Sequence, residues 1–194
     1  QTRRMRPTRI LPLDAGCPHV AHGTQPVHPA QCDGHSPFKI DVGVRRRENN
    51  RMARLHRLCV YCGSKTGTGD GFTNLARRLG HRCARQAVGI VYGGGGIGLM
   101  GALAAAARER GGQVIGVMPG HLRDRELAHD DLDELVVVES MHSRKREMAE
   151  RADAFCVLPG GIGSLDEAVE IITWKQLGLH DKPIVLLDHD GFWQ

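Results

Sequence analysis

The sequence predicts an α/β protein built on a Rossmann-like open parallel sheet, with helices on both faces and therefore three layers. Short apolar runs alternate with helix-like segments through the second part of the chain, and this alternation is typical of parallel sheets. Glycine-rich turns follow two of the apolar runs, at residues 93–98 and 160–163. Ligands of such sheets bind beyond the carboxyl ends of the strands, so we expect both turns to border one site.

The elements follow one another without interruption from residue 58 onwards. Strands are expected at residues 58–62, 88–92, 114–118, 135–138, 154–158 and 184–187. Helices are expected at about residues 70–86, 99–110, 141–151 and 164–177. The last of these helices carries apolar residues at helical spacing, and the second is rich in alanine.

The first 54 residues have a different composition, rich in Arg, Pro, His and Gly and with little apolar periodicity. Such a segment cannot bury enough apolar surface to offset the entropy of ordering it. We therefore expect residues 1–54 to be a disordered or non-native extension and residues 55–194 to form the folded domain. Met52 stands just before the first strand and would be a natural start.

The 194 residues suffice for one α/β domain with a full core. The net charge of +4 comes largely from arginines before residue 58, so it describes a tail and not a nucleic-acid surface. A basic nucleic-acid binder is the alternative, and its binding would depend steeply on salt. No apolar run reaches membrane-spanning length, and no signal peptide is apparent. We expect a cytoplasmic protein.

Six cysteines are present, and Cys59 and Cys62 form a CxxC pair. No second CxxC completes a zinc site, so free thiols in a reducing cytoplasm are expected. Histidines 19, 22, 28 and 35 lie in the N-terminal segment without the fixed spacing of metal ligands. We expect neither a metal nor a cofactor.

The stretch from Val157 to Glu167 joins an apolar strand, a Pro-Gly-Gly turn and a helix start. Glycines let the backbone approach a ligand closely, and the free amides of a first helical turn attract anions. Ser164 would cap the helix or donate its hydroxyl to a phosphate, with Glu167 facing the same mouth one turn later. The alternative is an ordinary capping box formed by Ser164 and Glu167.

The turn after the second predicted strand matches GxGxxG at Gly93, Gly95 and Gly98. A dinucleotide fingerprint normally follows the first strand and needs an acidic residue at the end of the next one. Here the next strand ends in Met118-Pro119. A mononucleotide phosphate or ribose contact fits this turn better than a dinucleotide, and the structural alternative is a tight turn with close helix–sheet packing.

The helix predicted from residue 141 places Met141, Arg144, Lys145 and Met148 on one face. The methionines suit a core or an interface, and the two charged residues would be solvated or would bind a ligand. Because this helix starts at the same sheet edge as the glycine turns, an arginine there could contact a phosphate or a ribose hydroxyl.

Two of these stretches resemble signatures of the LONELY GUY (LOG) family, whose members are cytokinin riboside 5′-monophosphate phosphoribohydrolases once labelled lysine decarboxylase-like. Residues 159–167 resemble the motif PGGxGTxxE, with Ser164 where Thr is usual, and residues 141–145 resemble MxxRK. Residues 62–64, 118–126 and 171–183 are also similar to the family. The resemblance begins at about Leu58. The family usually continues with a further helix beyond Trp193, so we expect a truncated C-terminus.

The resemblance implies hydrolysis of the N-glycosidic bond of a nucleoside 5′-monophosphate, either cytokinin riboside 5′-monophosphate or AMP, to free base and ribose 5-phosphate. It implies Arg144 and Glu167 as catalytic residues, no cofactor, no metal, and a homodimer or larger homo-oligomer. We expect substrate contacts at Ser64, Gly94, Gly95, Glu126, Lys145, Gly160, Gly161, Ile162, Gly163, Ser164, Leu165, Asp166 and Thr173. The alternative function is a nucleotide-binding or sensing module without turnover.

Overall fold

The computed structural model describes residues 9–11, 54–123, 129 and 131–194. Within them, parallel strands form one sheet in the order β1-β7-β6-β2-β3-β4-β5. The strands are β1 (Arg9–Leu11), β2 (Arg57–Tyr61), β3 (Gly89–Tyr92), β4 (Val114–Pro119), β5 (Glu134–Val138), β6 (Ala154–Val157) and β7 (Ile184–Leu187). The helices are α1 (Gly71–Arg85), α2 (Gly98–Arg108), α3 (Met141–Arg151) and α4 (Ile162–Gln176), with a short 3-10 helix, η1 (Gly120–Leu122).

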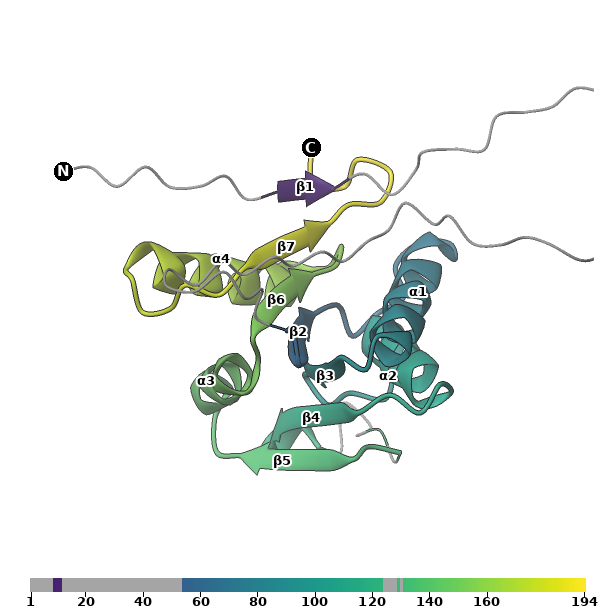
Figure 1. The fold of residues 1–194 in the computed structure, drawn as a ribbon, viewed down its shortest axis with the longest axis horizontal. Helices are drawn as coiled ribbons and strands as arrows, with labels where there is room; N and C mark the ends of the chain where they lie inside the picture. The colour runs from purple at the N-terminus through teal and green to yellow at the C-terminus, as the bar shows by residue number, and fades with distance from the viewer. Residues whose placement is uncertain (1–8, 12–53, 124–128, 130) are drawn as a thin grey trace, which may run out of the picture.

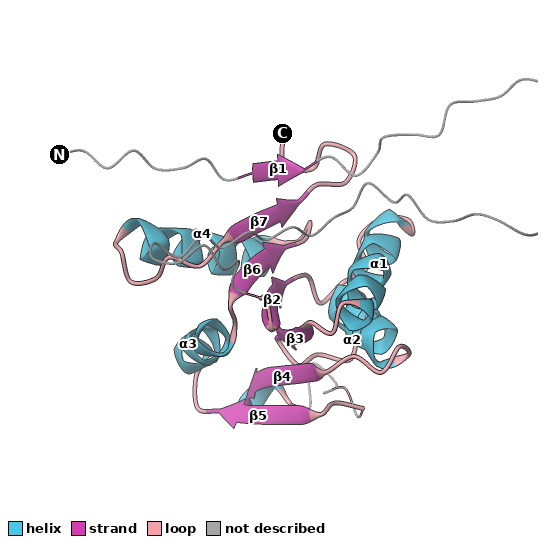
Figure 2. Cartoon of the chain, in the orientation of Figure 1, coloured by secondary structure: helices cyan, strands magenta, loops and turns pink. Residues whose placement is uncertain are grey.

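The sheet is covered on both faces. Helices α1 and α2 lie on one face, and α3 and α4 lie on the other (Figures 1 and 2). Leu79 and Leu103 belong to the buried apolar cluster on the first face, and Met148 and Ile171 belong to the cluster on the second. Every residue of β3, β4 and β6 is buried, as expected for parallel strands covered on both sides. The predicted three-layer α/β fold is therefore confirmed.

Helices α1 and α2 approach each other closely because small residues line their contact. A Cβ placed on Gly80 of α1 would lie 2.5 Å from the carbonyl oxygen of Leu103 in α2. Ala104 and Ala107 of α2 are almost fully buried. Larger side chains at these positions would push α1 away from α2 and from the sheet.

Edge strand β1 was not expected from the sequence. It pairs in parallel with β7, with Arg9 opposite Val185 and Leu11 opposite Leu187, and Figure 1 shows it beside β7. A strand of three residues is too short to show a period-2 pattern in sequence. The rest of the N-terminal segment, including Met52 and the four histidines named above, lies outside the described residues, so the expected domain division stays a prediction.

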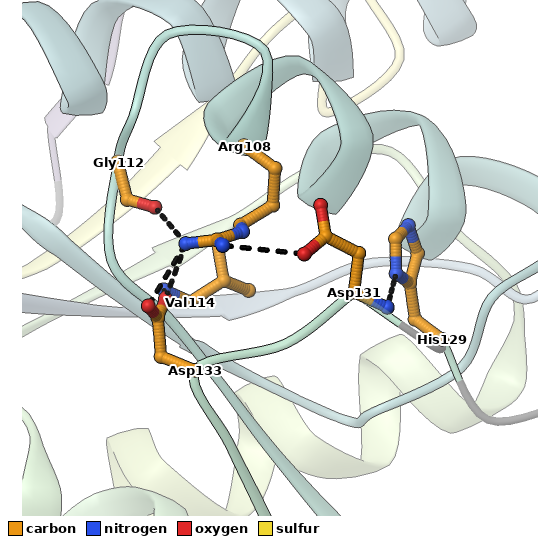
Figure 3. A network of polar contacts seen from close by, with 6 residues as sticks. All are labelled: Arg108, Gly112, Val114, His129, Asp131 and Asp133. Atoms are coloured by element: carbon orange, nitrogen blue, oxygen red, sulfur yellow. Dashed lines mark hydrogen bonds and ion pairs between the residues drawn. The ribbon is translucent and has the colours of Figure 1, made fainter.

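The amino-terminal edge of the sheet is fastened by Arg108 at the end of α2 (Figure 3). Its Nη1 donates to both carboxylate oxygens of Asp133, at 2.8 and 2.9 Å, and to the carbonyl oxygen of Gly112 at 3.2 Å. Its Nη2 donates to Asp131 at 3.2 Å. Asp133 also accepts the main-chain N–H of Val114 at 2.7 Å. These contacts join the loops that precede β4 and β5, at the opposite edge from the glycine turns.

No helix in the described part of the chain is long and apolar enough to cross a membrane.

Candidate active site

A cavity of about 580 Å³ opens at the carboxyl-terminal edge of the sheet. Segments that follow four of the strands line it, together with the start of α3. These segments are residues 62–68 after β2, Leu99 and Met100 after β3, residues 159–164 with 166 and 167 after β6, and Phe192 after β7. The cavity thus lies at the edge of the sheet where the sequence predicts the site.

Helix α4 aims its N-terminus at this cavity. The helix begins at Ile162 with Gly161 at the N-cap, and the first N–H groups of a helix have no acceptor within it. They carry a partial positive charge that attracts anions. A Cβ on Gly160 would lie 2.3 Å from the Ser164 hydroxyl oxygen, so only glycine fits beside that side chain.

Ser164 does not cap the helix. Because α4 starts two residues before it, Ser164 lies inside the first turn, where its side chain is buried and lines the cavity. The alternative given above, a capping box formed by Ser164 and Glu167, is therefore wrong, because Gly161 is the N-cap and no side chain caps the helix. Ser164 and the first residues of α4 line the same cavity.

Arg144 is fixed by main-chain oxygens at the ends of two strands. Its Nε donates to the carbonyl oxygen of Val117 at 3.1 Å, and its Nη2 donates to that of Gly93 at 3.0 Å. The residue is 5% exposed and lines the cavity. A Cβ on Gly93 would lie 1.9 Å from the same Nη2, so the guanidinium occupies the space that only a glycine leaves open.

Glu167 lines the same cavity from α4 and is half-buried. Burial raises the pKa of the Cys62 thiol at the cavity wall, the negative charge of Glu167 raises it further, and the positive charge of Arg144 lowers it. Cys62, Arg144 and Glu167 all line this cavity. The structure therefore brings the two predicted catalytic residues together.

The other predicted substrate contacts fall into three groups. Seven line the cavity: Ser64, Gly160, Gly161, Ile162, Gly163, Ser164 and Asp166. Five are described but are not among its lining residues: Gly94, Gly95, Lys145, Leu165 and Thr173. Glu126 lies outside the described residues.

The GxGxxG turn serves close packing. Gly94 and Gly98 both have positive φ, at +81° and +63°. A Cβ on Gly98 would lie 2.3 Å from main-chain atoms of Ser64. The turn thus lets α2 begin directly beside the loop after β2, which is the structural alternative given above. Substrate contact by Gly94 and Gly95 stays a prediction.

Lys145 and Thr173 make their polar contacts with helix α4. Lys145 forms ion pairs with Asp166 and Glu170 of α4, and the Thr173 hydroxyl donates to the carbonyl oxygen of Val169 at 2.8 Å. Leu165 is 40% exposed. Leu165 and Thr173 are residues of α4, and Lys145 is a residue of α3 that contacts α4.

Two aromatic rings at the cavity were missed from the sequence. Phe72 and Phe192 both line it, with their centroids 5.8 Å apart in an edge-to-face arrangement. Asp188 shapes the turn that carries Phe192, since its carboxylate accepts the N–H groups of Gly191 and Trp193 at 3.0 Å each. Phe72 follows β2 and Phe192 follows β7 in sequence, so both lie at the carboxyl edge of the sheet, where ligands bind. This position after a strand is the sequence signal from which they could have been predicted.

The four cysteines in the described part of the chain are not grouped as metal ligands. Cys59 and Cys62 lie in the apolar clusters on opposite faces of the sheet, and both are buried free thiols, as are Cys83 and Cys156. The free thiols expected at these four positions are thus confirmed. Among the described residues, no group of three or more His, Cys, Asp and Glu could hold a metal ion.

Comparison with known proteins places the chain in a family. A family model described as "Possible lysine decarboxylase" matches residues 100–194. The probable cytokinin riboside 5′-monophosphate phosphoribohydrolase LOGL9 of Oryza sativa subsp. japonica is 41% identical over 179 residues, which is 91% of this chain and 79% of the relative. The chain belongs to the LONELY GUY family.

Further LONELY GUY relatives match at similar identity. The cytokinin riboside 5′-monophosphate phosphoribohydrolase LOG of Oryza sativa subsp. japonica is 48% identical over 143 residues, 74% of this chain and 59% of its own length. The LOG3 enzyme of Arabidopsis thaliana is 44% identical over 146 residues, 75% of this chain and 68% of its own. This LONELY GUY chain therefore spans between 59% and 79% of the relatives named here.

Solved structures share the fold of this LONELY GUY chain. The molybdenum cofactor carrier protein of Chlamydomonas reinhardtii superposes with a TM-score of 0.57 at 26% identity, over 69% of this chain and 76% of that one. A molybdenum cofactor binding protein of the phototrophic bacterium Rippkaea orientalis gives 0.57 at 22% identity, over 71% and 78%. At that lower identity the likeness concerns the fold alone.

Proposed function

We propose that this LONELY GUY protein hydrolyses the N-glycosidic bond of a nucleoside 5′-monophosphate, AMP or its N6-prenylated form, to free base and ribose 5-phosphate. One observation carries the proposal: Arg144 and Glu167, from two different helices, line a single cavity together with the N-terminus of α4. The names of relatives that are 41–48% identical support the same reaction.

The phosphate of the substrate would bind at the start of α4. The main-chain N–H groups of residues 162–164 and the hydroxyls of Ser64 and Ser164 border the cavity there. Hydrogen bonds to a charged phosphate are about twice as strong as those between neutral groups. Anchoring the phosphate at this point would place the ribose over Glu167 and Arg144.

The reaction proceeds through a transition state that resembles an oxocarbenium ion. As the bond from C1′ to the base nitrogen breaks, its electron pair leaves with the base, which takes up a proton, while a water oxygen bonds to C1′. The carboxylate of Glu167 would stabilise the developing positive charge and orient the water. Arg144, held rigidly by its main-chain contacts, would position the sugar.

Lys145 does not suit a decarboxylase, the activity that the description of the matching family model suggests. Pyridoxal phosphate enzymes form a Schiff base with an uncharged lysine amine. Burial on its own would lower the pKa of Lys145, but hydrogen bonds and charges from Glu170 and Asp166 raise it overall. This lysine therefore stays an ammonium ion and is unsuited to that chemistry.

We also propose that two copies of the chain associate through the outer face of α4. Ile162, Val169 and Leu177 are 85%, 61% and 69% exposed on or just after this helix, and contiguous exposed apolar side chains mark interaction surfaces. Thr173 lies on the exposed side of the same helix. Its expected substrate contact would then be to the site of the second copy. The free thiols favour a reducing compartment such as the cytoplasm.

Chromatography of the products after incubation with AMP, other nucleoside monophosphates and prenylated AMP tests the function. Wild-type protein should release free base. Glu167→Gln keeps the shape of the side chain but removes its charge, and should reduce base release about 100-fold or more. Arg144→Met should have a similar effect.

Two substitutions serve as controls for charge removal from exposed positions of α3. Glu150→Gln and Arg146→Met should leave base release within about twofold of wild type, because both side chains are exposed outside the cavity. Near-normal turnover by Glu167→Gln would refute the assignment. Saturable AMP binding by wild type without any base release would favour the module without turnover, a carrier-like role that the names of the solved relatives also suggest.

A further inference from the structure

Lys145 joins the two helices that carry the proposed catalytic residues. It follows Arg144 in α3, and its Nζ lies 3.0 Å from Asp166 Oδ2 and 2.8 Å from Glu170 Oε2 in α4. Asp166 in turn directly precedes Glu167. Each helix therefore carries two neighbouring residues with different roles. Arg144 of α3 and Glu167 of α4 line the cavity, whereas Lys145 of α3 and Asp166 of α4 form an ion pair that joins the two helices.

The pair of Lys145 and Glu170 is better shielded than an ordinary surface pair. The Lys145 side chain is only 14% exposed and that of Glu170 is 24% exposed, whereas that of Asp166 is 62% exposed. Exposed pairs contribute little because solvent and salt screen them, whereas a half-buried ammonium that serves two carboxylates is screened less. Two of the three N–H donors of Lys145 are thereby occupied within the protein.

The cluster stands beside the proposed phosphate site. Asp166 lies in the first turns of α4 and itself lines the cavity. Together with Glu167, which also lines the cavity, it brings two negative charges close to a helix start that has to accept a phosphate, and Glu170 adds a third charge one turn further along α4. Like charges this close repel, so these carboxylates would oppose the substrate unless a cation balances them.

We propose that Lys145 is a positioning residue, which neutralises Asp166 and Glu170 so that a phosphate monoester can bind at the start of α4, and which does not itself contact the substrate. The inference rests on the proposed function for the identity of that phosphate ester. It differs from the expectation drawn from sequence, in which Lys145 contacts the substrate directly.

Calorimetric binding of AMP, ribose 5-phosphate and adenosine tests this role. Lys145→Met should weaken the binding of both phosphate esters about 10-fold, because two carboxylates lose their counterion. The loss should shrink at high salt, which screens the repulsion. Adenosine carries no phosphate and should bind equally well to wild type and variant. Arg146→Met, which removes an exposed positive charge from the same helix, should leave all three affinities unchanged.

A second set of variants separates neutralisation from direct contact. In the triple variant Lys145→Met, Asp166→Asn, Glu170→Gln, the carboxylates need no counterion, and phosphate-ester affinity should return to within about threefold of wild type. The double variant Asp166→Asn, Glu170→Gln keeps Lys145 and should bind phosphate esters several-fold more tightly than wild type. This expectation for the double variant can be tested even if Lys145→Met does not fold. Circular dichroism shows whether each variant is folded.

Three results would overturn the inference: unchanged affinity in Lys145→Met, a triple variant that binds as weakly as Lys145→Met, or weaker binding by the double variant. The second would show that Lys145 holds the phosphate itself. Wild-type protein that binds AMP and ribose 5-phosphate but releases no base would refute the proposed enzyme and leave this role of Lys145 standing. Wild type that binds neither ligand would refute both.

Discussion

Among single residues, Arg144 shows most clearly how the backbone prepares a site. Its guanidinium is held by the carbonyl oxygens of Val117 and Gly93, which stand at the ends of β4 and β3. A buried guanidinium requires such acceptors, since burial without them would be costly. The sheet therefore fixes the orientation of this side chain before any ligand binds.

Substituting Gly93 should disturb Arg144 without changing Arg144 itself. In Gly93→Ala the new methyl group would lie 1.9 Å from Nη2 and 3.0 Å from the Met100 sulfur, so the guanidinium must move. A displacement of about 1 Å in a positioning group can reduce turnover about 100-fold. Steady-state kinetics with AMP measures the effect, with thermal unfolding to verify that the variant is folded.

Gly120→Ala is a suitable comparison at the end of β4. Its Cβ would meet only Val137 Cγ1, at 3.7 Å, which is ordinary van der Waals contact. This variant should keep wild-type kcat. If Gly93→Ala also turned over AMP at the wild-type rate, the arginine would not be the positioning group proposed here.

Residues in the two sequence motifs could be predicted because their chemistry is local. Arg144 and Glu167 were recognisable from MxxRK and PGGxGTxxE, and the structure places both at one cavity. Phe72 and Phe192 could not be found in this way, because their contact joins the start of α1 to the turn after β7, 120 residues apart in sequence. The start of α4 was predicted at Ser164, two residues too late, because the helix begins directly after the Pro-Gly-Gly turn, before the apolar pattern that indicates it.

Among the elements, α4 has both a buried and an exposed apolar face. Ala168 and Ile171 pack against the sheet, whereas Val169 is 61% exposed. A helix that is apolar all round is normally covered on every side. This is the basis for the proposed association of two copies.

Val169→Asp should weaken that association. A charge at the centre of an apolar interface is costly to bury, so sedimentation should show a larger monomer fraction than in wild type at equal concentration. Val137→Asp introduces the same charge at a comparably exposed position of edge strand β5 and should leave the assembly unchanged. A wild-type protein that sediments as a monomer at all concentrations would contradict the proposed interface.

The elements themselves were largely predictable, since each of the six predicted strands and four predicted helices is present with boundaries shifted by at most two residues. Buried apolar runs and alanine- or glycine-rich helix contacts leave a clear signal in sequence. Strand β1 left none, because three residues that pair with β7 from a distant part of the chain have no pattern of their own.

At the scale of the whole molecule, His180 should make stability depend on pH. Its Nε2 lies 2.9 Å from the carbonyl oxygen of Ile171, and its ring packs at 5.3 Å from Phe155. Burial lowers the pKa of His180, and the positive charges of Lys175 and Lys182 lower it further. The hydrogen bond to the Ile171 carbonyl and the negative charge of Asp181 raise it, but the net shift is downward. The unfolded chain then binds a proton near pH 6.5, the ordinary value for His, and the native protein only at lower pH.

Because the unfolded state binds more protons in that window, stability should fall as pH drops below about 6.5. Urea unfolding at pH 7.5, 6.5 and 5.5 measures this decline, and His180→Gln should reduce it. His142→Gln, an exposed histidine of α3, should retain the wild-type decline. An equal decline in His180→Gln and wild type would exclude this histidine as its source.

The network around Arg108 and Asp133 fastens the loops before β4 and β5, and the cavity is bordered by residues after β2, β3, β6 and β7. The contacts that stabilise the sheet and the loops that line the cavity thus lie at opposite edges of the sheet. Changes in the cavity loops leave the contacts of Arg108 and Asp133 in place. A protein engineer seeking a new nucleotide preference could therefore vary those loops while keeping the glycines that close packing requires, Gly93, Gly98 and Gly160.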